Sequence, residues 1–265
     1  MSDFLLGHEP AIRFVFSIAV FALVASGEVL FPRQVQQIGR LVRWPSNLGL
    51  VALNTVLVRL LLPTAAVGLA VIAEARGWGL LNLIALPAWL ALPLAVLLLD
   101  LAIYLQHRIF HAVPVLWRLH RMHHADLEFD VTTGLRFHPV EIALSMGIKF
   151  LVIAALGPSA LAVLIFEVLL NATSLFNHGN VALPGGIDRI LRRIVVTPDM
   201  HRVHHSIHPG ETNSNFGFNL PWWDRLLGTY RPQPRDGHDG MTIGIAQFRT
   251  PHDLRLDRML IQPVR

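Results

Sequence analysis

The chain of 265 residues contains no cysteine and few charged side chains. The absence of cysteine excludes disulfide bonds, thiolate-bound haem, cysteine-bound iron–sulfur clusters and thiol nucleophiles. Charged residues make up 15% of the chain, whereas an ordinary soluble domain has about 25%. Apolar residues make up 53%, and the mean hydropathy is +0.49. This composition predicts an integral membrane protein.

A basic segment before the first apolar run is also absent. The chain opens with Met1, Ser2 and Asp3 and carries Glu9, so we expect this run to be a retained membrane span rather than a cleaved signal peptide. The net charge is only +4, and arginines cluster beside apolar runs, which suits anionic lipid headgroups better than nucleic acid. We therefore expect contact with the bilayer and none with nucleic acid.

The apolar runs predict an all-α membrane bundle. Spanning a bilayer takes about 20 mainly apolar residues. Five stretches approach this length, at 10–31, 48–73, 84–106, 139–156 and 158–178. Gly157, Pro158 and Ser159 separate the last two stretches by a tight turn. The stretch 139–178 is therefore expected to form a helical hairpin with both ends on one side of the membrane.

A turn at Pro158 sets the depth of each residue in this hairpin. Lys149 then opposes Glu167 inside the membrane, where an unpaired charge is costly, so we expect the two to form an ion pair. Arg59 and Asp100 on neighbouring helices are candidates to join them.

The distribution of charge predicts the orientation. The loop after the first span carries Arg33, Arg40 and Arg43, whereas the loop after the second has Glu74 balancing Arg76. Cytoplasmic loops carry the excess of basic residues, so the first loop is assigned to the cytoplasm. The third span then runs inward, and the hairpin begins and ends on the cytoplasmic face. From about residue 179 the chain is polar, which predicts a cytoplasmic helical cap.

Histidines are concentrated in the second half of the chain, where eleven of the fourteen lie between His107 and His208. Most form boxes, which are His107-x3-His111, His120-x2-His123-His124 and His201-x2-His204-His205, and His138 and His178 stand between the boxes. Helical positions i, i+3 and i+4 share one face, so each box presents its imidazoles in one direction. The hairpin register also brings His138 and His178 together. Eight to ten imidazoles exceed the needs of one four-coordinate metal, which predicts two metal ions.

Several residues near the boxes are candidates to orient the imidazoles, because a metal-bound histidine usually donates its second N–H to a carboxylate or carbonyl. Asp100 and Tyr104 share a helical stripe with the first box, and Asp199 lies two residues before His201. For Asp100, pairing with a basic residue in the membrane is an equally good interpretation.

Familiar hydrolase and ferritin-like patterns are missing. Glu128, Asp130 and Glu141 are candidate carboxylate ligands, but the Glu-x-x-His pair of ferritin-like bundles does not occur. The chain also has no His-Glu-x-x-His zinc motif. Ser174 and Ser206 lack a Gly-x-Ser-x-Gly context, which argues against serine nucleophiles.

The motifs resemble one known family when they are taken in order. They are Gln106-His107-Arg108-x-x-His111, His120-Arg121-Met122-His123-His124, Arg136-Phe137-His138-Pro139-Val140-Glu141, Asn177-His178-Gly179 and Thr197-Pro198-Asp199-Met200-His201-Arg202-Val203-His204-His205-Ser206. Asn213-Ser214-Asn215-Phe216-Gly217-Phe218, Trp223-Asp224-Arg225-Leu226 and Gly228-Thr229-Tyr230 follow. This set resembles the fatty acid hydroxylase superfamily in its bacterial sterol desaturase branch. The resemblance covers 95–232, which leaves 1–94 as N-terminal membrane helices and 233–265 as a C-terminal tail.

This resemblance implies an integral membrane di-iron enzyme. Together with the orientation predicted from the charges, we expect it in a bacterial inner membrane with its active site on the cytoplasmic side. Such enzymes use O2 to hydroxylate or desaturate a lipid, which is a sterol, a fatty acyl chain or a related compound. Electrons then come from a separate reductase or ferredoxin-like partner. The implied iron ligands are His107, His111, His120, His123, His124, His201, His204 and His205, completed by His138 and His178. Zinc is expected to replace iron in overexpressed protein.

A membrane metal transporter, or a metal-binding protein without oxidase activity, is the alternative. A transporter needs its ligands near the middle of the membrane, whereas these histidines are expected at helix ends and in the cap. The sequence therefore favours the oxygenase.

Overall fold

The computed structural model describes residues 2–62, 64–84 and 86–265. The longer helices are α2 (Glu9–Leu30), α3 (Arg40–Leu61), α4 (Ala66–Ala75), α6 (Ala88–Ala112), α7 (Pro114–His124), α8 (Pro139–Leu156) and α9 (Ala160–Asn177). The shorter ones are α1 (Ser2–Gly7), α5 (Leu80–Leu83), η1 (Thr133–Leu135), α10 (Gly185–Leu191), α11 (Pro198–His204), α12 (Pro209–Thr212), α13 (Trp222–Leu226), α14 (Gly237–Gly240), η2 (Pro251–Leu254), α15 (Leu256–Met259) and η3 (Gln262–Val264). In these ranges β pairing is limited to isolated bridges, Pro32 with Val181 and Ser206 with Ile243. The prediction of an all-α fold is confirmed.

Five helical stretches of the described chain are long and apolar enough to cross a membrane. They are α2, the stretch Arg40–Leu83 that contains α3 to α5, and α6, α8 and α9. The expected span 48–73 is divided between α3 and α4. Leu62 ends α3 in an extended conformation, because a following proline disfavours the helical conformation for the residue before it. The expectation for Met1, and the parts of spans 48–73 and 84–106 at residues 63 and 85, lie outside the described residues.

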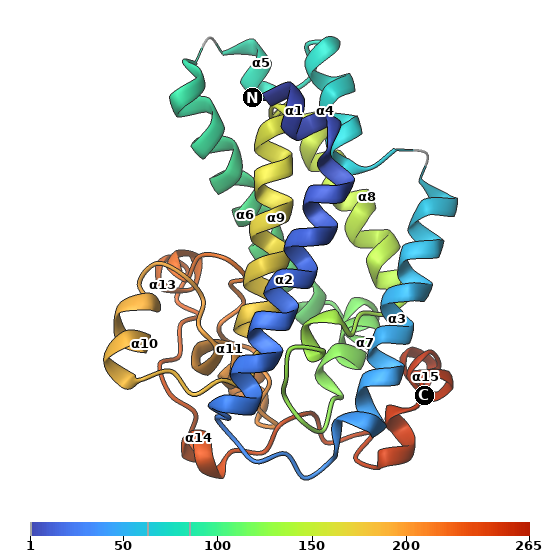
Figure 1. The fold of residues 1–265 in the computed structure, drawn as a ribbon, viewed down its shortest axis with the longest axis vertical. Helices are drawn as coiled ribbons and strands as arrows, with labels where there is room; N and C mark the ends of the chain where they lie inside the picture. Colours follow the sequence, from blue (N-terminus) through green and yellow to red (C-terminus); the bar gives the residue numbers. More distant parts are fainter. Residues whose placement is uncertain (1, 63, 85) are drawn as a thin grey trace.

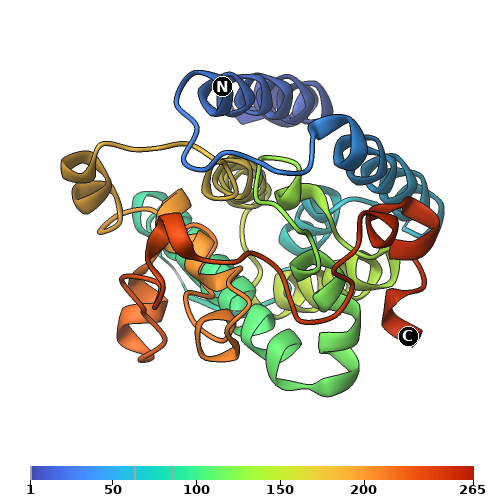
Figure 2. The ribbon, with the colours of Figure 1, turned by 90° about the horizontal axis from the view of Figure 1, so that it is seen from below.

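The long helices run side by side along the molecule (Figure 1). Helices α1, α4 and α5 lie at one end, and α7 and α10 to α15 form a cap at the other. Seen from the cap end, the segments after residue 179 cross the ends of the long helices (Figure 2). The third span, the second box and the hairpin all deliver their histidines to this end. The cap therefore has the expected place in the bundle, and its cytoplasmic orientation stays a prediction.

The hairpin turns where the sequence predicts. Helix α8 ends at Gly157, which adopts the left-handed conformation with φ 62°. Ser159 then caps α9 by accepting a hydrogen bond from the Ala162 backbone N–H at 3.3 Å. A Cβ atom on Gly157 would lie 2.1 Å from the Trp78 carbonyl oxygen. Glycine is thus required both by the backbone conformation and by the close approach of the loop before α5.

The predicted Lys149 to Glu167 ion pair is confirmed, with 2.8 Å between Nζ and Oε1. Arg13 of α2 joins this pair as a third charged residue, and its Nη1 lies 2.9 Å from Glu167 Oε2. The expectation that Arg59 and Asp100 join this pair is wrong. Helix α2 packs along α9 and brings its own cation to this depth, whereas Arg59 is exposed on α3.

Residues 233–265 pack against the helices. Met259 of α15 is buried with Leu50 of α3 and Met122 of α7. The Arg121 guanidinium donates to the backbone carbonyls of Gln262 and Arg265, each at 2.6 Å. The C-terminal segment thus belongs to the cap and supports the helix that carries the second box.

Candidate metal centre

Nine of the ten candidate ligands converge into two groups beneath the cap. The first group contains His107, His111, His120, His124 and His204, and the second contains His123, His178, His201 and His205. In each group the ligand atoms all lie within 4.8 Å of one another.

Helical spacing explains how the two boxes with three histidines divide between the groups. His120 and His124 are four residues apart on α7 and point to the first group, and His123 points to the second. In the third box His201 and His205 face the second group, and His204 faces the first. Positions i and i+4 lie above one another on a helix, so each box contributes to both groups.

The nitrogen atoms within each group are aimed at one another. His107 Nε2 lies 3.0 Å from His204 Nε2 and 3.2 Å from His120 Nε2. In the second group His178 Nε2 lies 3.1 Å from His201 Nε2 and 3.2 Å from His123 Nε2. Two nitrogens bound to one metal at about 2.1 Å, at a right angle, are about 3 Å apart. The spacing therefore fits shared metal ligation.

Several buried imidazole nitrogens have no hydrogen-bond partner among the described residues. They are both ring nitrogens of His124 and of His205, Nε2 of His111 and Nδ1 of His123 and His201. Buried polar atoms in proteins are nearly always paired. A metal ion in each group would bind some of these nitrogens, which is a second sign that the residues fit metal.

Burial keeps these imidazoles neutral. Five histidines of the cap have a pKa far below the usual value. Burial is the main cause, and neighbouring imidazoles are the second. The five are His123, His124, His201, His204 and His205. Burial also lowers the pKa of His178, to about 4. Metal binding requires the unprotonated ring, so the folded chain holds these side chains in the form that binds metal.

Oxygen atoms hold the outward-facing nitrogen of several rings. Glu141 Oε1 lies 2.6 Å from His120 Nδ1. Backbone carbonyls of Phe216, Ser214 and Ser174 lie 2.7 Å from Nδ1 of His107, His204 and His178, respectively. Such contacts fix the ring so that Nε2 faces the metal. The sequence identified Glu141 only as a possible ligand, and a carbonyl group leaves no signal in a sequence.

The structure places His138 outside both groups, which corrects the expectation that it lies beside His178. His138 is the N-cap of α8, and its Nδ1 accepts a hydrogen bond from the Val140 backbone N–H at 3.2 Å. Its Nε2 lies 3.2 Å from the Leu260 carbonyl oxygen. The hairpin register predicted the depth correctly, but the direction of a side chain at a helix terminus is set by capping.

Asp100, Tyr104 and Asp199 serve to join the helices to the cap. Asp100 Oδ2 accepts a hydrogen bond from the Trp223 indole at 2.8 Å, and the Tyr104 hydroxyl bonds Thr229 Oγ1 at 2.7 Å.

Asp199 pairs with Arg33 at 3.1 Å. None of the hydrogen bonds among the described residues joins these three to a histidine of either group, so their expected role in orienting the ligands is corrected. Their partners come from segments distant in sequence, which helical spacing does not reveal.

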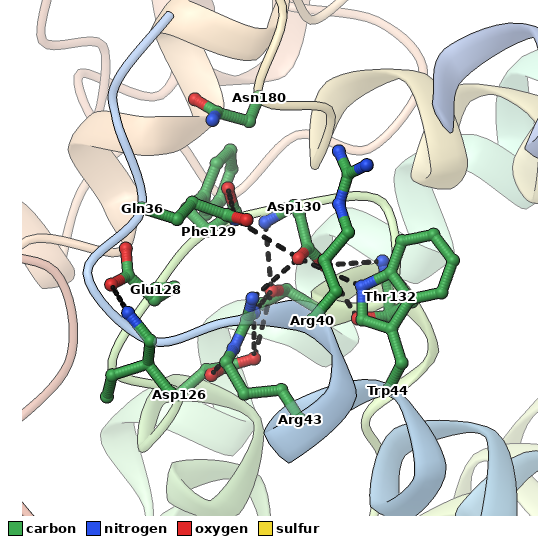
Figure 3. A network of polar contacts seen from close by, with 12 residues as sticks. Gln36, Arg40, Arg43, Trp44, Asp126, Glu128, Phe129, Asp130, Thr132 and Asn180 are labelled. Atoms are coloured by element: carbon green, nitrogen blue, oxygen red, sulfur yellow. Dashed lines mark hydrogen bonds and ion pairs between the residues drawn. The ribbon is translucent and has the colours of Figure 1, made fainter. Parts of the chain in front are cut away.

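A buried polar network supports the chain just after the second box (Figure 3). Arg43 of α3 donates to both oxygens of Asp126, at 2.7 and 2.8 Å, and to Asp130 at 2.5 Å. The Trp44 indole also donates to Asp130, at 3.1 Å. Glu128 instead accepts the backbone N–H groups of residues 37 and 38. Asp130 and Glu128 thus accept hydrogen bonds from residues outside the histidine groups, although the sequence made them candidate ligands.

A cavity of about 350 Å³ opens beside the first histidine group. His107, His120 and Glu141 line one end, and Phe110, Phe137 and Phe218 stand around them. From there the cavity extends between α3, α6, α8 and α9 to Lys149 and Glu167. The histidine group therefore faces a space that an elongated apolar molecule can fill.

Similarity to known proteins identifies the family to which this site belongs. The family model for fatty acid hydroxylase matches residues 92–229, which is more than half of the chain. The chain belongs to the fatty acid hydroxylase family. This confirms the resemblance seen in the motifs, and the matched range contains all nine grouped histidines. The family is iron-dependent, and the two groups of imidazoles fit iron.

Several curated relatives of this member of the fatty acid hydroxylase family have names that describe lipid-oxidising enzymes. The chain is 32% identical to ornithine lipid hydroxylase OlsE of Rhizobium tropici over 58% of this chain and 46% of the relative. Identity to alkylglycerol monooxygenase of Xenopus tropicalis is 29% over 56% of this chain and 32% of the relative. Human cholesterol 25-hydroxylase is 29% identical over 51% of this chain and 49% of the relative. The chain spans less than half the length of these relatives. No solved structure matches it.

Proposed function

We propose that the protein is a membrane-bound di-iron oxygenase that uses O2 and external electrons to hydroxylate or desaturate a lipid C–H bond. One observation carries this proposal. Two groups of largely buried imidazoles adjoin one another, and His107 and His120 of the first group line one end of a cavity that enters the membrane part of the bundle. The named activities of the relatives, which are lipid hydroxylases and monooxygenases, support it.

The chain provides the surroundings that such a reaction needs. Iron, when bound, supplies the activation of O2 and the oxidation of a C–H bond. Glu141 and the carbonyls of Phe216 and Ser214 hold their histidine rings in place. Phe110 and Phe137 line the cavity beside the rings, which excludes water from the reacting carbon. The cavity walls hold a lipid chain with one of its carbons next to His107 and His120.

The positions of the histidines favour an oxygenase over a metal transporter. Both groups lie at helix ends and in the cap, whereas transport requires ligands along the middle of the membrane. We further propose that 95–232 forms the catalytic domain, that the chain resides in a bacterial inner membrane and that its cap faces the cytoplasm. Electrons then arrive from a reductase or ferredoxin-like protein on that side.

Metal content tests the proposal directly. Protein purified from iron-replete cells should contain about two irons per chain by elemental analysis, and Mössbauer spectra should show an exchange-coupled pair. Zinc is expected to displace iron in overexpressed protein, because zinc binds most nitrogen sites more tightly than ferrous iron.

A ligand variant links the metal to the activity. His204→Ala should abolish lipid oxidation by the reconstituted protein while the variant still inserts into the membrane. A stoichiometry of one metal or none in iron-replete protein, or normal turnover by His204→Ala, would refute the di-iron oxygenase. Lipid analysis of a deletion strain beside the complemented strain would identify the product.

A further inference from the structure

The cavity beside the first histidine group ends in charged side chains inside the membrane part of the bundle. Lys149 of α8, Glu167 of α9 and Arg13 of α2 all line it. Glu167 is paired with Lys149 at 2.8 Å and with Arg13 at 2.9 Å. Arg13 is also paired with Glu9, at 2.7 Å. We call these four residues the charged cluster. Charged groups inside a membrane are costly, which makes them candidates for a functional role.

Hydrogen-bonding capacity remains at this end of the cavity. In the described part of the chain the Lys149 ammonium has its one hydrogen bond to Glu167. An ammonium has three N–H donors, so two are available to a ligand. The side-chain oxygen of Asn171, one turn from Glu167, is buried in the cavity wall without a partner among the described residues. The same is true of the Gln106 side-chain oxygen.

These groups define the chemistry of a ligand that fits. The Lys149 donors require an acceptor, and the Asn171 and Gln106 oxygens require a donor. A hydroxyl group both donates and accepts. The charged cluster contains two cations and two carboxylates, so its charges balance. A neutral group is therefore favoured over a carboxylate or phosphate, which Glu167 would repel.

We propose that this end of the cavity binds the hydroxyl group of a neutral lipid alcohol, with Lys149 and Asn171 as its specificity-determining residues. This inference rests on the proposed function, because it places the polar end of the substrate of that same site. It also gives a role to the ionic side chains of a cavity that is lined as well by the apolar Ile103, Met146 and Leu170.

The cavity also sets the distance between the hydroxyl and the carbon that is oxidised. Glu141, which contacts His120, and Lys149 lie eight residues apart on α8. At a rise of 1.5 Å per residue they are separated by about 12 Å along the helix. A bound alcohol should therefore be oxidised in the middle of its chain, about 12 Å from its hydroxyl.

Direct binding to the metal-free protein tests the proposal without any turnover. The probes are radiolabelled octadecanol, octadecanoate, octadecylammonium and octadecane, which share one chain length and differ in the end group. We expect octadecanol to bind more tightly than the other three. Lys149→Met and Asn171→Leu should each weaken octadecanol binding by about tenfold and leave octadecane binding unchanged.

Arg59→Met is the matched control, because it removes a cation from an exposed position on a membrane helix. It should bind octadecanol as the unmodified protein does. Lys149→Met leaves Glu167 paired with Arg13, and thermal melting in detergent verifies that each variant is folded. Tighter binding of octadecanoate or octadecylammonium, or full octadecanol affinity in both cavity variants, would overturn the proposal.

The two proposals fail separately. If the metal-free protein binds octadecanol through Lys149 but the iron-loaded protein oxidises no lipid, the proposed function fails and the alcohol site stands. If lipids are oxidised while Lys149→Met and Asn171→Leu bind octadecanol normally, the alcohol site fails and the oxygenase stands.

Discussion

At the scale of single residues, surroundings give identical histidines different roles. His204 is fully buried, with its Nδ1 held by a carbonyl and its Nε2 turned toward His107. His138 caps a helix, and His208 is partly exposed and pairs with Asp236 at 2.7 Å. Only the first arrangement leaves a neutral nitrogen pointing at other imidazoles. Spacing in the sequence finds the candidates, and the direction in which each ring points in the folded chain distinguishes grouped histidines from the others.

His178 and His138 provide a matched pair for the ligand assignment. His178→Ala should reduce the iron content by about half, because the second group retains only three imidazoles. His138→Asn should keep full iron content, since asparagine also caps a helix N-terminus and His138 lies outside both groups. Elemental analysis of both purified variants is the measurement. Equal iron loss in the two would show that the assignment of His138 is mistaken.

At the scale of elements, buried ion pairs fix the segments around the boxes. Arg43→Met should lower the free energy of unfolding by about 3 to 5 kcal/mol, because it removes the nearest cation from the buried Asp126 and Asp130 carboxylates and leaves Asp126 only the Arg136 guanidinium, 4.0 Å away. Arg40→Met is the control, since its partner Glu28 keeps two backbone N–H donors and the loss should be about 1 kcal/mol or less. Denaturant unfolding in detergent micelles measures both. Similar losses in the two variants would contradict this account of the network.

The same ion pair makes stability depend on acid. Burial alone would raise the pKa of Asp126, but the Arg43 guanidinium lowers that pKa below its usual range. A carboxylate with a lowered pKa contributes fully above its unfolded pKa of about 3.9 and loses that contribution as the pH falls further. The unmodified protein should therefore lose stability below about pH 4, and Arg43→Met should lose less. Unfolding measured across this pH range tests the sign.

The hairpin turn offers a second comparison at the element scale. Gly157→Ala should destabilise the protein by more than about 1 kcal/mol, because φ is 62° and the new Cβ would meet the Trp78 carbonyl and the Asn82 amide. Gly147→Ala, in the middle of α8 with open space around its Cα, should stabilise it by up to about 1 kcal/mol. Melting temperatures in detergent measure both changes. A stable Gly157→Ala protein would mean that the turn accepts a Cβ.

At the scale of the whole molecule, orientation rests on arginines that also have structural partners. Arg33 pairs with Asp199, Arg40 with Glu28 and Arg43 with Asp126. The concentration of arginines in this part of the sequence thus reflects folding as well as membrane topology. The cytoplasmic placement of the cap is therefore a prediction that needs its own test.

The absence of cysteine makes this test clean. Glu74→Cys at the α4 end and Arg235→Cys in the cap introduce single exposed thiols at opposite ends of the molecule. A membrane-impermeant maleimide should label Glu74→Cys in spheroplasts, because the proposed orientation places that end in the periplasm. Arg235→Cys should react only after permeabilisation. The reverse pattern would invert the proposed orientation.

Local patterns in the sequence determined much of the architecture. The five apolar runs, the turn at Gly157 and the pairing of Lys149 with Glu167 followed from helical rise and from the cost of a lone charge in a membrane. The convergence of the boxes followed from hairpin topology. Such features depend on spacing along one segment or across one tight turn, which a sequence states directly.

Tertiary structure alone decided the rest. It assigned each histidine to one of two groups, removed His138 from both and placed Arg13 beside Glu167 where Arg59 had been expected. It also supplied the carbonyls that hold the imidazoles. These outcomes depend on how far each helix is rotated and which distant segment packs against it. Rotation and packing are settled by the whole core, so no local pattern in the sequence records them.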